Sequence, residues 1–441
     1  MSKSRWQPYS RYKDSGVEWL GEIPAHWRVK RLKYAAMVNP EVLSEDTDLD
    51  FVMQYVDISN VDSAGTILGT QEMRFQNAPS RARRRVRNND VIISTVRTYL
   101  RAIAFVGNPP DNLIVSTGFA VLRPTSESEL EPRYAWRLVQ SSGFVDTVVA
   151  HSEGIGYPAI APTRLADLPV WLPPLDEQRA IATFLDREAA RIDALVAKQG
   201  RLIALLQEKC AALISHTVTK GLDPRAPMRD SNIPWVGEIP AHWAIAPVYA
   251  RYQVQLGKML DQKQITGEHL WPYLRNIDVQ WDQINTADLP EMDFPPSSRA
   301  RFALQSGDLL VCEGGEVGRA AIWRGELEEC YYQKALHRLR PYRHSDVPRF
   351  LYYVLYNAAK QGIFVASGNP NTIDHLTAEK LSKHRFAFPP AQEQRTIATY
   401  LDRETAKLDA LIAKAREMIE RLQEYRTALI SAAVTGKIDV R

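Results

Sequence analysis

The sequence contains an internal duplication, and this duplication constrains the fold of the chain more than any other feature. The phrase GEIPAHW occupies residues 21–27 and again residues 237–243, which are 216 positions apart. The same separation relates two longer blocks, LPPLDEQRAIATFLDREAARIDALVAK from Leu172 and FPPAQEQRTIATYLDRETAKLDALIAK from Phe388. Two repeats therefore fill the 441 residues, which exceed the length of one ordinary core.

Between the matching blocks the two halves diverge. They keep SRAR at residues 80–83 and 298–301 and an aspartate at Asp90 and Asp308, now 218 positions apart. Short apolar runs such as DVIIST and DLLVCE, separated by Gly and Pro turns, predict a mixed α/β variable domain in each repeat. The aromatic residues and proline of GEIPAHW are expected to dock each variable domain onto the long helix of its constant block.

Each constant block predicts one long helix. Paired prolines block any upstream continuation, and acidic residues occupy the first turn. Gly221 and Gly436 mark the predicted ends. Apolar residues recur at alternating steps of four and three, which is typical of a coiled-coil seam. The same register is interrupted by Glu188, Gln199 and Lys209 in the first repeat, whereas the second repeat has Glu404, Ala415 and Tyr425 at these places. The predicted seam residues are Ile181, Leu185, Ile192, Leu195, Leu202, Leu206 and Leu213 in the first repeat, and Ile397, Leu401, Leu408, Leu411, Met418, Leu422 and Leu429 in the second.

Two such helices are expected to pack against each other. Each seam covers about forty residues, or about 60 Å at 1.5 Å per residue, which is too long for an ordinary core helix. A pseudo-twofold relation between the repeats would make the helices antiparallel. We therefore expect an α+β fold in which two mixed α/β domains, related by pseudo-twofold symmetry, are separated by two long antiparallel helices that form a coiled coil. The predicted segments are the variable domains 1–171 and 223–387 and the helical segments 172–222 and 388–441.

Composition and motifs exclude several classes of protein. Cys210, Cys312 and Cys330 show no CxxC spacing, which argues against a disulfide framework or a thiolate zinc site and favours a reducing cytoplasm. No apolar run reaches the length of a membrane span, so no membrane association is expected. The NPPD at residues 108–111 has an acid where amino-methyltransferase loops have an aromatic residue, and EGGEVGR at 313–319 lacks the end of a phosphate-binding loop. We expect no catalytic site, metal or cofactor in this chain.

Arginine is concentrated in one stretch of the first variable domain. SRARRRVR, from Ser80, carries five arginines in seven residues, and the second repeat keeps two of them. A solvated charge run is the simpler interpretation, but contact with DNA phosphates explains why both repeats keep SRAR, and the guanidinium fork also suits guanine readout. Loops GIGYP from Gly154 and SGNPN from Ser367 occupy matched places, and their glycines allow close approach to a ligand. The predicted DNA-binding residues are Arg81, Arg83, Arg84, Arg97, Tyr99, Arg101, Tyr157, Arg299, Arg301, Arg319 and Asn369.

The constant blocks, LPPLDEQRAIATFLD and FPPAQEQRTIATYLD, together with the paired GEIPAHW phrases, resemble the specificity subunit of Type I restriction-modification systems. The resemblance covers nearly the whole chain. It implies that the variable domains are two target recognition domains, each reading one half of a bipartite asymmetric site in double-stranded DNA, with the helices as spacer. It also implies a non-catalytic chain that binds two modification subunits for adenine-N6 methylation and two restriction subunits for cleavage. S-adenosylmethionine, ATP and Mg would then belong to the partner subunits.

Three other interpretations stay open at this point. The chain could be a stand-alone DNA-binding decoy or regulator with the same fold, which co-purification with modification subunits would distinguish. It could be a coiled-coil assembly scaffold whose arginines only solvate it, and such a scaffold would lack salt-dependent affinity for DNA. It could also be an enzyme whose site escapes recognition, and methylation assays on the isolated chain would test that.

Overall fold

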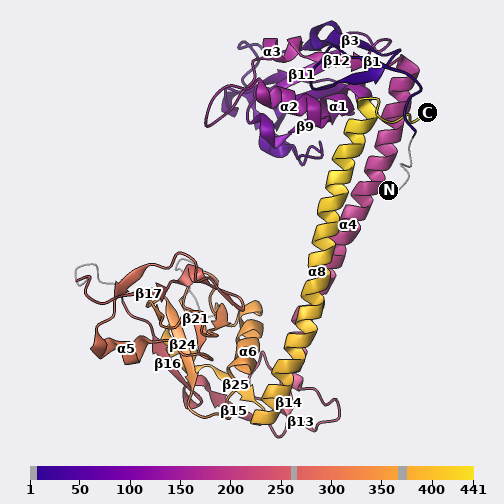
Figure 1. Ribbon diagram of the computed structural model, residues 1–441. Coiled ribbons are helices and arrows are strands. Elements are labelled where there is room, and N and C mark those ends of the chain that lie inside the picture. The colour runs from indigo at the N-terminus through magenta and orange to yellow at the C-terminus, as the bar shows by residue number, and fades with distance from the viewer. Residues whose placement is uncertain (1–6, 260–265, 366–374) are drawn as a thin grey trace. The chain divides into compact units, whose positions relative to one another are not determined.

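The computed structural model describes residues 7–259, 266–365 and 375–441. These residues form two compact units, one built from residues 1–200 and 416–441 and the other from residues 201–415 (Figure 1). The two longest helices, α4 (Leu175–Lys220) and α8 (Ala391–Val434), each contribute to both units. The α+β fold predicted from the sequence, with two mixed α/β domains and long helices, is therefore confirmed.

The ends of both long helices follow the local signals in the sequence. Paired prolines precede Leu175 and Ala391, the first helical residues. Gly221 and Gly436 follow the last turns with φ of +74° and +72°, a left-handed conformation that glycine adopts without steric cost. The predicted starts and stops of these helices are thus confirmed to within a few residues.

In each unit the start of one long helix packs against the end of the other. The core of the first unit holds Ile181 and Leu185 of α4 with Leu429 and Ile430 of α8. In the core of the second unit the helices exchange roles, and Ile214 and Val218 of α4 accompany Ile397 and Leu401 of α8. The two helices therefore run antiparallel in both units, as predicted.

Part of the predicted seam is exposed. Leu195 and Leu202 of α4 and Leu411 and Met418 of α8 each keep more than a third of their surface accessible. These residues lie near the middle of the two helices. The seam prediction is therefore wrong for these four residues, because a pair of helices without a third layer buries only a narrow stripe of each.

Two four-stranded sheets and three short helices build the variable domain of the first unit. One sheet has the order β4-β11-β8-β9, and the other has the order β6-β5-β10-β7, in which only β5 and β10 run parallel. Two strand pairs, β1-β2 and β12-β3, complete the sheets. The elements are β1 (Tyr12–Asp14), β2 (Glu22–Pro24), β3 (Arg28–Arg31), β4 (Ala36–Val38), β5 (Val52–Val56), β6 (Gln71–Arg74), β7 (Ala82–Arg85), β8 (Asp90–Ser94), β9 (Ile103–Val106), β10 (Leu113–Ser116), β11 (Phe119–Pro124), α1 (Pro132–Gln140), α2 (Ser142–Ala150), α3 (Pro162–Asp167) and β12 (Pro169–Leu172).

The second unit repeats the first sheet as β16-β24-β21-β22 and the second, with one strand fewer, as β20-β17-β23. Three strand pairs, β13-β14, β15-β25 and β18-β19, accompany them. The elements are β13 (Met228–Asp230), β14 (Glu238–Pro240), β15 (Ala244–Pro247), β16 (Tyr252–Leu256), β17 (Leu270–Leu274), β18 (Val279–Gln280), β19 (Gln283–Ile284), β20 (Glu291–Asp293), α5 (Pro296–Phe302), β21 (Leu309–Cys312), β22 (Ala320–Ile322), β23 (Tyr331–Tyr332), β24 (Leu336–Pro341), α6 (Pro348–Lys360), α7 (Ala378–Lys383) and β25 (Arg385–Phe388).

The repeated phrase GEIPAHW holds the first turn of a long helix in both units. Glu177 of α4 accepts a hydrogen bond from Trp27 Nε1 at 2.9 Å and lies 2.7 Å from His26 Nε2. Glu393 of α8 accepts from Trp243 Nε1 at 3.0 Å, and His242 Nε2 lies 2.8 Å from it. The phrase therefore recurs because each variable domain binds the first turn of a long helix through the equivalent glutamate.

The next residue of each constant block makes a second repeated contact. Gln178 Oε1 accepts the backbone N–H of Glu131 at 2.9 Å, just before α1. Gln394 Oε1 accepts the backbone N–H of Val347 at 3.0 Å, just before α6. About two turns further along α4, Asp186 forms an ion pair with Arg137 of α1 at 2.8 Å. The constant blocks thus place the variable domains by hydrogen bonds as well as by apolar packing.

Candidate nucleic-acid interface

Four of the predicted DNA-binding residues meet on one surface of the first unit. The turn between β8 and β9 presents Arg97, Tyr99 and Arg101, and the loop after α2 presents Tyr157. The guanidinium of Arg97 stacks on the ring of Tyr157, 4.5 Å from its centroid. We call this group, with the neighbouring Leu100 and Ile155, the loop surface.

Backbone hydrogen bonds join the two loops that form the loop surface. The N–H of Arg97 donates to the carbonyl of Pro158 at 2.8 Å, and the hydroxyls of Thr98 and Ser152 lie 3.0 Å apart. Tyr99 and Tyr157 are both exposed. Because the loops hold each other, the surface presents two arginines and two aromatic rings in a fixed arrangement.

The turn carries backbone strain at both ends. Arg97 and Arg101 have φ of 53° and 55° and enclose the single turn η4 (Thr98–Leu100). A residue with a Cβ in this left-handed region costs roughly 1–2 kcal/mol relative to the right-handed one. Such strain occurs preferentially at functional sites, where the surrounding structure holds it.

The arginines of SRARRRVR lie beside this surface rather than on it. Arg81 Nη2 pairs with Asp57 Oδ2, so its charge is largely neutralised. Arg83 and Arg84 belong to strand β7, which pairs with β10. Arg83 stacks on the ring of Phe75, at 4.6 Å from its centroid. Burial lowers the pKa of Arg84, whose Nε has no partner among the described residues.

One turn connects Arg81 to the loop surface. The N–H of Thr117 donates to the carbonyl of Arg81 at 2.7 Å, and the N–H of Thr95 donates to the carbonyl of Gly118 at 2.8 Å. The structure therefore places Arg81 next to the loop surface and leaves Arg83 and Arg84 along the strand that leads away from it.

The SRAR of the second repeat lies in a different element. Residues 298–301 belong to helix α5, whereas residues 82–85 of the first repeat form β7. Arg299 Nε donates to the carbonyl of Phe294 at 3.0 Å, and Arg301 lies over the ring of Phe302 at 5.2 Å. The two SRAR phrases are therefore not structurally equivalent, and our assumption that they share one contact has no support in their geometry.

Arg319 is held internally. Its Nη2 donates at 2.9 Å to both the carbonyl and the side-chain oxygen of Asn276, and its Nε is buried without a partner among the described residues. Arg319 stands 218 positions after Arg101 and is its counterpart in the second repeat. The side chain of Arg101 is 38 % exposed. Asn369, the last predicted residue, lies outside the described residues.

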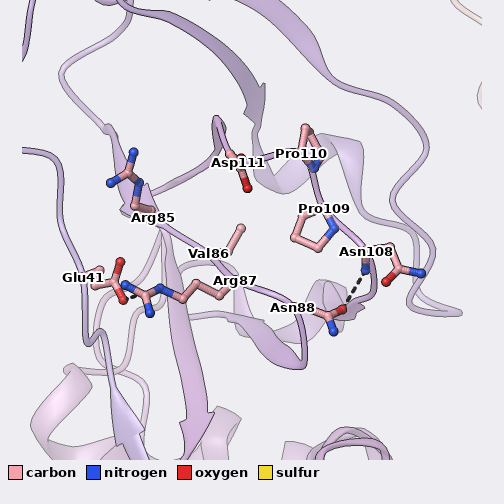
Figure 2. Close-up of a pocket in the computed structure, with 9 residues that line it drawn as sticks. All are labelled: Glu41, Arg85, Val86, Arg87, Asn88, Asn108, Pro109, Pro110 and Asp111. Carbon is pink, nitrogen blue, oxygen red and sulfur yellow. Dashed lines mark hydrogen bonds and ion pairs between the residues drawn. The ribbon is translucent and has the colours of Figure 1, made fainter.

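A cleft of about 670 Å³ opens at the far end of β7 (Figure 2). The loop 108–111, which carries the NPPD phrase, forms one wall, and residues 85–88 form another. Arg87 Nε lies 2.7 Å from Glu41 Oε1, and the backbone N–H of Asn108 donates to Asn88 Oδ1 at 2.8 Å. Two arginines and two acidic residues line the cleft, and their charges offset each other. The cleft therefore attracts a phosphate less strongly than the loop surface does.

Sequence reasoning missed two apolar members of the loop surface. Leu100 is 44 % exposed, and Ile155 is fully exposed. The available signal was their position, since Leu100 lies between two arginines and Ile155 lies between two glycines. Sequence reasoning also missed the hydrogen bonds of Glu177 and Gln178, whose repetition in both constant blocks was visible.

The described residues show neither a membrane-spanning helix nor a metal-binding cluster. In residues 7–259, 266–365 and 375–441 no helix is long and apolar enough to cross a membrane. Within the same residues no group of three or more His, Cys, Asp or Glu side chains is arranged to hold a metal ion.

Comparison with known proteins identifies the family. The family model described as "Type I restriction modification DNA specificity domain" matches residues 77–199 and 295–421, more than half of the chain. A protein assigned as the MjaX type I restriction enzyme specificity subunit of Methanocaldococcus jannaschii is 23 % identical over 440 residues, 96 % of each chain. The EcoBI specificity subunit of Escherichia coli is 28 % identical over 131 residues, 30 % of this chain and 27 % of that one.

Solved structures share the fold. The HsdS subunit from Thermoanaerobacter tengcongensis is 25 % identical, with a TM-score of 0.56 over 94 % of this chain and 98 % of its own. A chain from a structure that describes assembly and conformational transition of the type I restriction-modification system is 24 % identical, with a TM-score of 0.74 over 93 % of this chain and 98 % of that one. From these matches and from the duplicated fold, the chain belongs to the family of type I restriction-modification DNA specificity subunits.

Proposed function

We propose that this specificity subunit reads a bipartite DNA site, with each variable domain contacting one half. The observation that carries the proposal is the loop surface, where Arg97 and Arg101 stand beside Tyr99 and Tyr157 on a strained, hydrogen-bonded turn. Guanidinium groups contact phosphates and guanine edges, and aromatic rings stack on bases. Both kinds of group are therefore available to DNA in one place.

The two half-sites should differ in sequence. At the place of Arg97 the second repeat has Gly315, and at the place of Tyr99 it has Val317, 218 positions later in each case. A pair of identical readers would favour a palindrome, because the symmetry of a bound site mirrors that of its protein. Different side chains at matched positions favour an asymmetric target.

Catalysis would belong to partner subunits. In this proposal two modification subunits dock on the chain and methylate adenine at N6, and two restriction subunits add cleavage of unmodified DNA. S-adenosylmethionine, ATP and Mg would be bound by those partners, in the cytoplasm. The support is that the matched relatives are named specificity subunits of type I restriction enzymes.

Methylation separates this proposal from its alternatives. We expect the isolated chain to transfer no methyl group, and a complex with two modification subunits to methylate adenine on both strands of one split site. Methylation-aware sequencing of DNA from cells that carry the complete system measures this directly. Methyl transfer by the isolated chain, or a complex that modifies no defined site, would contradict the proposal.

A further inference from the structure

The loop surface exposes apolar side chains where a water-facing turn would ordinarily carry polar ones. Leu100 is 44 % exposed and Ile155 is fully exposed, and they belong to the two loops that Arg97 and Thr98 connect by hydrogen bonds. A single exposed leucine is common and means little. Here Leu100 lies on a turn whose two ends, Arg97 and Arg101, have a strained backbone, and Ile155 lies in the loop that this turn contacts.

The second repeat folds the equivalent turn inward. Gly315 and Gly318, with φ of +73° and +84°, stand where the first repeat has Arg97 and Leu100. A Cβ at Gly318 would lie only 2.5 Å from the ring of Phe364, so the turn packs closely against that ring. Val317 is 9 % exposed and belongs to the core. Among the described residues, the turn between β21 and β22 therefore presents no apolar side chain like that of Leu100, and we call Leu100 and Ile155 of the first repeat the apolar tip.

The turn that carries Leu100 is also held by several contacts before any partner binds. Besides the contacts of Arg97 and Thr98, Thr95 Oγ1 donates to the carbonyl of Gly118 at 2.9 Å, and Val96 and Ala159 form a β-bridge. A fixed tip loses little conformational entropy when it enters a partner. It can therefore hold a neighbouring base pair in a distorted geometry.

The charges beside the tip favour DNA over an apolar protein groove. Among the described residues no carboxylate lies within ion-pair distance of Arg97, and Arg101 reaches only the exposed Asp146, at 3.4 Å. Two arginines that flank an apolar tip can contact the phosphates on either side of an opened base step. Apolar wedges of this kind enter DNA between base pairs and unstack them.

We propose that Leu100 and Ile155 form a wedge that unstacks one base step in the half-site read by the first repeat, while the other half-site stays regularly stacked. This inference rests on the proposed reading of a bipartite DNA site. A pyrimidine–purine step is the favoured place, because such steps unstack at the lowest cost. Tyr99 and Tyr157 are placed to stack on the bases that the wedge separates.

The test uses the complex with modification subunits and DNA that carries 2-aminopurine at one position at a time, excluding the adenines that become methylated. We expect the fluorescence to rise several-fold at one step of one half-site. The rise should be lost in Leu100→Ala and Ile155→Ala, with affinity for the site about tenfold weaker. Leu49→Ala, which shortens an exposed leucine of the same unit away from these loops, is the matched control and should behave like the unmodified chain.

Each other outcome contradicts either the proposed wedge or the proposed function, and the outcomes can be told apart. Tight, site-specific binding without any rise in fluorescence would refute the wedge and leave the proposed function intact. A rise in both half-sites would refute its restriction to the first repeat. If Leu100→Ala released a modification subunit and left DNA affinity unchanged, the tip would be a protein contact. A complex that binds no specific DNA would instead refute the proposed function, and thermal unfolding of each variant checks that it is folded.

Discussion

At the scale of single residues, one buried ion pair is repeated almost atom for atom. Asp90 meets Arg123 through Oδ1–Nε at 2.7 Å and Oδ2–Nη2 at 2.8 Å. Asp308 meets Arg340 through the same atoms, both at 2.7 Å. Each aspartate also accepts the backbone N–H three residues upstream. The aspartate that both variable domains keep is therefore a structural residue that fixes the turn before β8 or β21.

Removing one partner of this pair should destabilise the protein strongly. In Arg340→Met, Asp308 is left as a buried carboxylate without its cation, a change that costs about 3–5 kcal/mol. Urea unfolding followed by tryptophan fluorescence measures the loss. Arg343→Met, at an exposed position nearby, should change the free energy of unfolding by less than about 0.5 kcal/mol. Equal stability of the two variants would contradict this role of the pair.

The three thiols should differ in reactivity because burial raises their pKa values unequally. Burial raises the pKa of Cys312 to about 11 and that of Cys330 to about 12. Burial also raises the pKa of Cys210, which is only half-buried on α4. Since the thiolate is the reactive species, we expect iodoacetamide at pH 8 to label Cys210 first in the folded chain. Mass spectrometry reads the sites, and labelling of Cys312 as fast as Cys210 would contradict the expectation.

At the scale of elements, the contact of GEIPAHW with a long helix differs between the units in the exposure of the carboxylate and in one further ion pair, because Arg441 Nη1 lies 3.9 Å from Glu177 Oε2. Glu177 is 4 % exposed, whereas Glu393 is 28 % exposed, although both accept from a buried tryptophan. A hydrogen bond to a charged group contributes about 1.5–3 kcal/mol, and the penalty for leaving the acceptor unsatisfied grows with burial.

The comparison of Trp27→Phe with Trp243→Phe measures how much the more buried carboxylate depends on the tryptophan N–H. Both tryptophans are fully buried, so the two variants lose similar packing. We expect Trp27→Phe to lower the free energy of unfolding by about 1–2 kcal/mol more than Trp243→Phe, because the carboxylate left behind is less hydrated. Chemical unfolding of the two variants under the same conditions measures this. An equal loss, or the opposite order, would refute the role of the tryptophan N–H.

The long helices could be predicted from sequence because their signals are local and repeated. Proline pairs mark the starts, glycines mark the ends, and the apolar spacing extends over many turns. SRAR offers no such length. Four residues cannot show a period. The last two residues of the first SRAR begin β7, which pairs with β10, whereas the second SRAR lies within α5, which begins at Pro296. Tertiary pairing and the preceding residue decide the structure in these two places.

The site could be predicted only in part for the same reason. Arg97, Tyr99 and Arg101 are close in sequence, and their arginine–aromatic pattern indicates DNA contact. Their meeting with Tyr157 depends on the hydrogen bond from Arg97 to Pro158, which joins loops that no local pattern relates. For Arg319 the sequence pattern predicts DNA contact, but the guanidinium donates a hydrogen bond to the side chain of Asn276 instead.

At the scale of the whole molecule, the two repeats share their contacts with the long helices and differ in the turns predicted to contact DNA. Glu177 and Gln178 recur as Glu393 and Gln394 with nearly identical hydrogen bonds, so both variable domains are attached to a long helix in one way. The turns that would meet DNA differ in side chain, backbone conformation and exposure. Under the proposed function, a common attachment with two different reading surfaces would let one half-site change without disturbing the other.

The salt dependence of DNA affinity, measured on the intact complex, tests whether arginines of the two repeats differ in their contact with DNA. Each phosphate contact contributes about 0.9 to the slope of log K against log salt, so Arg97→Gln and Arg101→Gln should each lower the slope by about 1 and weaken binding to matched and mismatched DNA alike. Arg319→Gln should leave the slope unchanged and lower the stability of the second unit instead, because Arg319 already bonds to Asn276. Fluorescence anisotropy over a series of salt concentrations measures all three variants. An unchanged slope in both Arg97→Gln and Arg101→Gln would show that these arginines only solvate the chain.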